Sequence, residues 1–376
     1  MSYELTNQHC LFSAPAHPDV KVCVVVPVKD EEDNIVQTLK ALHFQKDEFG
    51  QALNSSCYET LVLVNNSVDA SFGLCRQYQQ QHPDFNLHIC QITLPQDVAH
   101  IGTVRKLLMD EACNRLLQVP DARGIIVSTD GDSMVDEQFV YQIMLEFDKD
   151  VDVVSGRIIA RDLPKAAKLP HLRDVGYRFL VSRLEAYLDP SVYDPWPRHF
   201  QCYGPSIAVT CRIYQKAGGI KAIPCLEDEE FRKALKRIDA KMRKSPKVKI
   251  YTSSRLAGRV PFGFSVQLRQ WQEMQLAGTE QVVESFSTVH YRLVNKKRLR
   301  LLWLQDRQDA DTLKGLKSYA EKLELDAGWL ENSFLNADYF EALWEEVDAV
   351  LFHQNNVIHV AAPISKAMQE FRAFFA

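Results

Sequence analysis

The 376-residue chain lacks a large excess of charge, a cysteine framework and any long apolar run. Its formal net charge is -5, whereas nucleic-acid binding concentrates Lys and Arg on one face, so we expect no nucleic-acid partner. The nine cysteines are odd in number and contain no CxxC pair, so they suggest neither a disulfide framework nor a zinc site. Because no apolar run reaches the roughly 20 residues that cross a bilayer, and residues 1–19 show no signal-peptide pattern, we expect a soluble, cytoplasmic protein without a transmembrane segment.

Apolar, β-branched runs alternate with amphipathic segments in the first half of the chain. Lys21–Lys29 is such a run, and the helical pattern of Asp33–Leu42 follows it. The same alternation predicts three more strands and two more helices, at Thr60–Val64, His88–Leu94 and Gly124–Ser128, and at Phe72–Gln81 and Val104–Leu117. Strands alternating with helices predict an α/β fold with a doubly wound, mostly parallel central sheet.

The alternation loosens after residue 133. Strands are expected at Val151–Ile159, Ser206–Cys211 and Val248–Thr252, and helices at Leu172–Leu188 and Asp228–Ile238. From about Ser265 the pattern is helical and polar, with helices expected at Val266–Met274, Ala310–Leu323 and Asp338–Phe352. The sequence therefore predicts a C-terminal helical extension to the α/β fold.

Polar residues follow several of the buried strands directly. In a parallel sheet the ligand site forms at the carboxyl ends of the strands, so these segments are the candidates. They are Lys29–Asn34, Asn65–Asp69, Asp130–Ser133 and, at the start of a helix, Glu227–Glu230. Neither GxGxxG nor GxxxxGK follows the first strand, which disfavours a dinucleotide-binding Rossmann site and a P-loop.

The triplet Asp130-Gly131-Asp132 is the sharpest of these candidates. Two carboxylates one residue apart can hold a divalent cation, and a hard ion such as Mn²⁺ or Mg²⁺ would bridge the two phosphates of a nucleoside diphosphate. The alternative is a solvated acidic turn without a ligand.

Six segments in order resemble the inverting glycosyltransferases of family two, which have the type A fold. These segments are VVVPVKDEEDNI, LVNNSVD, IGTVRKLL, VSTDGDS, YGPSIAVTCRIYQKAGGI and LEDEEF. The resemblance covers about Val22 to Arg259 and leaves out the helical tail. It implies transfer of a sugar, of the hexosyl type, from a nucleotide-diphosphate sugar to an acceptor hydroxyl.

The resemblance also implies roles for individual residues. The nucleotide-sugar site would comprise Pro27, Val28, Glu31, Asn66, Asp69, Arg105, Asp130 and Gly131. Asp132, together with Asp130, would bind the Mn²⁺ or Mg²⁺ ion, and Gly204, Pro205 and Ser206 would line the sugar and acceptor pocket.

Asp228 matches the catalytic base of the family, with Glu227 as its neighbour. A carboxylate within hydrogen-bond reach of the acceptor hydroxyl can take its proton as the new bond forms. Alternatively, the acidic run is only the charged first turn of a helix. Arg255 and Arg259 could bind diphosphate or an anionic acceptor, or pair with acidic structural neighbours instead.

The resemblance and the composition together suggest a domain plan. We expect an N-terminal extension at 1–20, a catalytic domain at 21–264 and a helical subdomain at 265–376 that could mediate homo-oligomerisation. Within the catalytic domain, residues 21–133 would bind the nucleotide sugar and residues 134–264 the acceptor, whose identity as a sugar, a lipid-linked group or a small molecule stays open. Two alternatives are a metal-dependent, phosphate-handling hydrolase with Asp130 or Asp132 as nucleophile, and a non-catalytic sugar-nucleotide-binding or scaffold protein.

Overall fold

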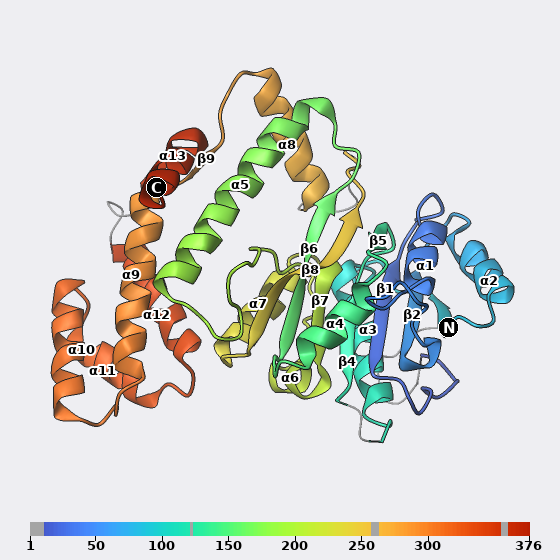
Figure 1. Ribbon diagram of the computed structural model, residues 1–376, viewed down its shortest axis with the longest axis horizontal. Coiled ribbons are helices and arrows are strands. Elements are labelled where there is room, and N and C mark those ends of the chain that lie inside the picture. Colours follow the sequence, from blue (N-terminus) through green and yellow to red (C-terminus); the bar gives the residue numbers. More distant parts are fainter. Residues whose placement is uncertain (1–10, 121–122, 257–262, 355–359) are drawn as a thin grey trace. The chain divides into compact units, whose positions relative to one another are not determined.

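A computed structural model describes residues 11–120, 123–256, 263–354 and 360–376 (Figure 1). The chain divides into two compact units, which we call the sheet unit and the helical unit. The sheet unit comprises Met1–Asp162, Gln201–Ala234 and Lys241–Gly263, and the helical unit comprises Leu163–Phe200, Leu235–Ala240 and Phe264–Ala376. The two units therefore interleave along the chain, whereas the domain boundary predicted from the sequence lies at residue 264.

The sheet unit is built on an eight-stranded sheet in the order β3-β2-β1-β4-β7-β6-β8-β5. The strands are β1 Val22–Val28, β2 Tyr58–Asn65, β3 Leu87–Ile92, β4 Ile125–Ser128, β5 Ser133–Val135, β6 Val153–Ala160, β7 Ile207–Thr210 and β8 Met242–Thr252. β1 is parallel to both β2 and β4, β2 to β3, and β6 to β8, while β7 and β5 pair antiparallel with their neighbours. The predicted α/β class with a mostly parallel sheet is confirmed.

The strand register brings the polar loops together. Val28 at the end of β1 lies opposite Val64 of β2, and Ser128 at the end of β4 lies opposite Val25. Every residue of β1 is buried, as expected for a parallel strand covered on both faces. The loops that follow β1, β2 and β4 therefore leave the sheet at one edge.

Six α-helices begin in the described residues of the sheet unit. They are α1 Ile35–His43, α2 Ser71–Gln81, α3 Ile101–Leu116, α4 Phe139–Phe147, α6 Cys211–Lys216 and α7 Glu227–Arg237. The sequence did not predict α4, α6 or the three-residue strand β5. The reason is clearest for α4, whose sequence FVYQIMLEF is almost continuously apolar and so shows no polar face to mark a helical period.

The helical unit consists of α5 Lys165–Leu188, α8 Phe264–Leu276, α9 Phe286–Trp303, α10 Ala310–Lys322, α11 Ala327–Asn336, α12 Phe340–Gln354 and α13 Ile364–Phe374. A short antiparallel pair, β9 Val282–Glu284 and β10 Ala361–Pro363, joins two of its connections. The predicted helices at α5, α8, α10 and α12 are present, but α9, α11 and α13 were not predicted. In α9 the buried face includes polar residues such as Asn295 and Lys296, so the helix lacks the regular spacing of apolar residues that marks an amphipathic helix. Lys296 is compensated by an ion pair of 2.7 Å with Glu341.

Within the described residues, none of the helices has both the length and the apolar character that a bilayer crossing requires.

Candidate active site

The loops at the carboxyl edge of the sheet contact one another through the Asp130-Gly131-Asp132 turn. Asp130 and Asp132 follow β4 and precede β5, and the hydroxyl of Thr38 on α1 donates to the Gly131 carbonyl at 2.9 Å. The turn is therefore held against the start of α1, beside the loop that follows β1.

Arg105, near the start of α3, is the centre of a buried network. Its side chain is 4% exposed. The guanidinium donates to Glu227 Oε1 at 3.1 Å and to Asp130 Oδ1 at 2.9 Å. It also donates to the Gly204 carbonyl at 3.0 Å and to the Ser128 hydroxyl. Arg105 thus contacts Asp130, Gly204 and Glu227, which lie 25, 99 and 122 residues after it in the sequence.

Two pKa values in this network are raised, those of Arg105 and Glu227. Burial acts to lower the pKa of Arg105, but the negative charges of Asp130 and Glu227 outweigh it and raise that pKa above its ordinary value. Burial raises the pKa of Glu227, and the neighbouring Asp228 adds to this, while Arg105 opposes it. The arginine is therefore a permanent positive charge among three carboxylates.

Two glycines make this close packing possible. A Cβ on Gly102 would lie 2.0 Å from the Ile223 carbonyl oxygen, and a Cβ on Gly204 would lie 2.9 Å from the Arg105 guanidinium. Any side chain at either position would push α3 or the Gly204 loop away. The glycines thus set how closely Arg105 approaches the segment before α7.

Asp228 lies in the first turn of α7 and is tied to the same network. Its Oδ2 accepts a hydrogen bond from the Gly204 amide at 2.7 Å, and its Oδ1 accepts one from the Glu229 amide at 2.8 Å. Asp228 is half-buried, whereas Glu227 is 5% exposed and pairs with Arg105. Of the two predicted catalytic acids, Asp228 is therefore the more accessible.

A second arginine engages the other side of the Asp130-Gly131-Asp132 turn. Arg255, in the loop after β8, donates to the two carboxylate oxygens of Glu31 at 2.9 and 3.0 Å. Its Nη2 also lies 3.2 Å from Asp132 Oδ2. Burial acts to lower the pKa of Arg255, but the hydrogen bonds to Glu31 and the charge of Asp132 raise it. The predicted ribose-facing residue Glu31 and the predicted metal ligand Asp132 thus share one guanidinium.

A pocket of about 390 Å³ opens beside Arg255. It is lined by Asn34, Gln37, Arg161, Asp162, Ser253, Ser254 and Arg255. Among the described residues, Arg161 Nε and Ser254 Oγ are both buried without a hydrogen-bond partner, so two residues of the pocket lining carry polar atoms that the described structure leaves unsatisfied. Sequence reasoning missed Arg161, although it directly follows β6 and so fits the rule that singled out the other loops.

Some of the predicted nucleotide-sugar residues make local structural contacts. The side chain of Asn66 exchanges two hydrogen bonds with the Leu94 backbone, at 2.9 and 3.0 Å. Asp69 accepts from the Glu32 and Ser71 amides, each at 3.0 Å, and so joins the loops after β1 and β2. Neither residue contacts Arg105 or Arg255 through a described hydrogen bond, and their predicted contact with a nucleotide stays a prediction.

Further predicted positions lie around the two arginines. Pro27 and Val28 are buried at the end of β1. Pro205 follows Gly204, and the Ser206 hydroxyl accepts from the Gly156 amide at 2.9 Å. Arg259 lies outside the described residues.

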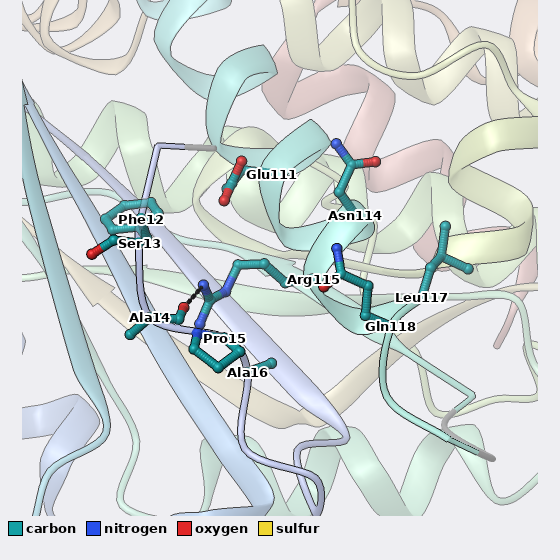
Figure 2. A pocket seen from close by; sticks show the side chains of 10 residues that line it. All are labelled: Phe12, Ser13, Ala14, Pro15, Ala16, Glu111, Asn114, Arg115, Leu117 and Gln118. Atoms are coloured by element: carbon teal, nitrogen blue, oxygen red, sulfur yellow. Dashed lines mark hydrogen bonds between the residues drawn. The ribbon is translucent and has the colours of Figure 1, made fainter. Parts of the chain in front are cut away.

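A larger pocket, of about 490 Å³, lies near the opposite end of α3 (Figure 2). It is lined by residues 12–16 and by Glu111, Asn114, Arg115, Leu117 and Gln118. Arg115 is ten residues, or about 15 Å along the helix, from Arg105. It donates to the Ala14 carbonyl at 2.5 Å and forms a buried ion pair with Glu59. This pocket therefore lies apart from the predicted catalytic and nucleotide-sugar-binding residues.

The carboxylates of Asp130 and Asp132 fit a hard divalent cation by their chemistry. Mg²⁺ and similar ions are commonly held by one or two carboxylates, with substrate phosphates and water completing the shell. In the described residues, no histidine, cysteine or further carboxylate gathers with these two to complete a cluster of three ligands. Substrate phosphates and water would therefore have to supply the remaining oxygens, and Asp132 would have to exchange its contact with Arg255 for the ion.

Comparison with models of known protein families gives a match. Residues 23–202 match the model described as glycosyl transferase family 2. None of the curated proteins matches significantly.

Several solved structures are similar to the chain. One, S. aureus TarS 1–349 in complex with UDP, has 13% identity and a TM-score of 0.45, with 92% of this chain and 96% of that one covered. Another, the mannosyltransferase PcManGT from Pyrobaculum calidifontis in complex with GDP-Man and Mn²⁺, has 16% identity and a TM-score of 0.44, covering 96% and 87%. A third, GalNAc-T7 with UDP, GalNAc and Mn²⁺, has 12% identity and a TM-score of 0.45, covering 90% and 58%.

Proposed function

We propose that this chain, which belongs to glycosyl transferase family 2 through residues 23–202, is an inverting, metal-assisted transferase with Asp228 as its general base. It takes a sugar, of the hexosyl type, from a nucleotide-diphosphate donor and passes it to an acceptor hydroxyl. The observation that supports this most directly is the convergence of Asp130, Gly204 and Glu227 on one buried guanidinium. Through Gly204 the same network reaches Asp228.

On the donor side, Asp130 and Asp132 would hold Mn²⁺ or Mg²⁺. Such an ion neutralises negative charge on the departing nucleoside diphosphate. Arg105 keeps Asp130 oriented through its 2.9 Å hydrogen bond, so that carboxylate needs little reorganisation when the donor arrives. Glu31, at the end of β1, would face the ribose.

Arg255 would change partners when the donor binds. Its guanidinium now neutralises Glu31 and Asp132. Once Asp132 binds the cation, that charge is released, and a guanidinium can donate two hydrogen bonds to a phosphate in the same way as to a carboxylate. Arg161 lines the same pocket and could share this task. The diphosphate would then be bound by two arginine side chains, Arg255 and Arg161.

On the acceptor side, Asp228 would take the proton of the attacking hydroxyl. Each of its oxygens accepts one backbone hydrogen bond, and each keeps a second lone pair that can accept another. Gly204, Pro205 and Ser206 would form the adjoining wall of the acceptor pocket. Glu227 is less suited to this role, because it is buried and its charge is engaged by Arg105.

The geometry gives less support to the hydrolase alternative. Asp130 and Asp132 each pair with a guanidinium, whose positive charge stabilises the carboxylate and makes it a weaker nucleophile toward phosphorus. A scaffold protein would need neither a base beside the acceptor wall nor metal-dependent nucleotide binding.

The direct test is a thermal-shift screen of the purified chain with UDP, GDP and their sugar conjugates, each with Mn²⁺, Mg²⁺ or chelator. A ligand that binds only the native state raises the melting temperature, and the rise grows with the logarithm of the ligand concentration above its Kd. We expect stabilisation by at least one nucleoside diphosphate only when the metal is present. The conjugate that stabilises is then assayed for release of its nucleoside diphosphate. Indifference to every nucleotide would contradict the proposal.

A further inference from the structure

Three metal-binding side chains lie together at a place that the proposed reaction does not use. They are His43, the last residue of α1; His82, which follows the end of α2; and Asp84, in the turn before β3. One potential ligand atom from each lies within 4.8 Å of the other two. Asp84 leads into the start of β3, so the cluster lies near the amino edge of the sheet, whereas Glu31 and Asp130 lie at its carboxyl edge.

His43 is held rigidly in this cluster. Its ring stacks on Phe44 at a centroid distance of 4.4 Å and on Phe85 at 4.7 Å. The side chain is only 6% exposed. A ligand fixed by packing in this way loses little conformational freedom when a metal binds.

The hydrogen bonds of His43 suit a metal ligand. Nδ1 lies 3.2 Å from the Tyr78 hydroxyl, and Nε2 lies 3.2 Å from Asp84 Oδ2. When Nδ1–H donates to the Tyr78 oxygen, Nε2 carries a lone pair that faces the Asp84 carboxylate. Both Nε2 and the carboxylate oxygen are then acceptors, and a cation between them would bind both. Metal-bound histidines commonly donate their other ring N–H in this manner. In the opposite tautomer Nε2–H donates to Asp84 and no cation is needed, so the experiment below has to separate the two.

His82 supplies the second nitrogen ligand. Its ring lies 5.0 Å from that of His43 and 4.3 Å from that of Tyr78, between centroids. In the described part of the chain its ring nitrogens have no hydrogen-bond partner, and the side chain is half-exposed. Ligands about 2.0 Å from a tetrahedral ion lie about 3.3 Å apart, so a rotation of His82 that moves its nitrogen by at most about 1.5 Å would close the site.

We propose that His43, His82 and Asp84 bind one Zn²⁺ ion, with water in the fourth position. Two imidazoles and one carboxylate suit zinc and related borderline ions, whereas the carboxylate pair Asp130 and Asp132 suits Mg²⁺ or Mn²⁺. The ion fastens the end of α1 to the turn between α2 and β3. The site lies at the opposite edge of the sheet from Glu31 and Asp130, so it is independent of the proposed transfer reaction.

The test is titration of the metal-stripped full chain with Zn²⁺ by calorimetry, and with Co²⁺ by the visible absorption of a tetrahedral site. We expect one Zn²⁺ per chain and a higher melting temperature on binding. His82→Asn, at a half-exposed position, should weaken Zn²⁺ binding at least about tenfold, since loss of even a supporting partner costs about 10–100-fold. Circular dichroism checks that the variant is folded.

Two further variants serve as controls. His17→Asn changes another histidine that contacts an aspartate, Asp19, outside the cluster and should bind Zn²⁺ as the wild type does. Asp132→Ala should also retain Zn²⁺, because it removes only the carboxylate pair at the other edge of the sheet. The inference is wrong if the wild type takes up no stoichiometric Zn²⁺, or if His82→Asn binds it with unchanged affinity.

Discussion

Arg255 lies 3.2 Å from Asp132, on the carboxylate that the proposed reaction needs for its metal ion. The same guanidinium holds both oxygens of Glu31. Glu31 and Asp132, both assigned to binding of the sugar donor, therefore pair with Arg255 when no sugar donor is bound. Binding of metal and nucleotide must exchange these contacts, and this exchange makes the donor site testable without knowledge of the acceptor.

Replacing Arg255 with Gln should separate metal affinity from turnover. Without the guanidinium, a positive charge that competes with the metal ion for Asp132 is removed, so we expect Mn²⁺ to bind about tenfold more tightly in the absence of nucleotide. Turnover should fall, because the diphosphate loses a donor. Calorimetry with Mn²⁺ measures the first effect and nucleoside diphosphate release the second. Arg76→Gln, which removes an exposed arginine of α2 that donates a hydrogen bond to Gln79, is the control. Equal Mn²⁺ affinities in the two variants would show that Arg255 does not compete for Asp132.

Asp132→Ala should abolish metal-dependent nucleotide binding. The variant loses one of the two carboxylates proposed to hold the cation. The other carboxylate, that of Asp130, is paired with Arg105. The readout is the shift in melting temperature caused by nucleoside diphosphate with Mn²⁺. Asp33→Asn changes an exposed acid in the loop after β1 and should keep the wild-type shift. Normal Mn²⁺-dependent binding by Asp132→Ala would remove the metal assignment.

Asp228→Asn should bind the donor normally and lose turnover by about 10²- to 10⁴-fold, the usual contribution of a general base. The amide keeps the size of the side chain but cannot take a proton. Glu230→Gln changes another acid in the first turn of α7 and tests whether the acidic run only stabilises the helix. If both variants lose activity equally, the special role of Asp228 is refuted. Product analysis and donor binding are measured on the same preparations.

Gly102→Ala should destabilise the fold by about 1–3 kcal/mol, as overpacking of a close contact does. The new Cβ would lie 2.0 Å from the Ile223 carbonyl, and backbone on one side or the other must shift. Gly73→Ala is the matched control, because its Cβ meets nothing within 4 Å in helix α2. That substitution should stabilise by about 0.5–1 kcal/mol through helix propensity. Urea unfolding measures both, and equal signs would contradict the packing argument.

The buried ion pair of Glu59 and Arg115 predicts a pH dependence of stability. Burial acts to raise the pKa of Glu59, but Arg115 and His88 lower it from 4.5 to about 2. A carboxyl whose folded pKa is depressed contributes stability above its unfolded pKa, and that contribution disappears as the pH falls from about 4.5 to about 2. The loss amounts to about 3 kcal/mol by linkage.

Unfolding by urea across this pH range measures the slope, and Glu59→Gln should flatten it. An unchanged slope in that variant would mean that other carboxyls carry the acid sensitivity. Glu59→Gln also leaves Arg115 buried without its partner, so the variant should be less stable at neutral pH.

The amino-acid sequence by itself determined the longer strands of the sheet, the loops that follow them and the candidate acids. Buried β-branched runs such as Val22–Val28 and Ile125–Ser128 predict parallel strands, and polar residues at their ends mark the ligand edge. Asp130, Asp132 and Asp228 are therefore visible as candidates without coordinates. Their catalytic and metal-binding roles stay predictions that the variants above test.

Only the tertiary structure decided which charges meet. Arg105 pairs with Glu227 across 122 residues, and Arg255 pairs with Glu31 across 224. The His43, His82 and Asp84 cluster likewise joins the ends of two helices to a turn. Such pairs carry no local pattern, because strand order, register and the close approach at Gly102 and Gly204 bring them together. Side-chain periodicity reports the faces that a segment buries, whereas contacts between distant segments depend on how those faces pack.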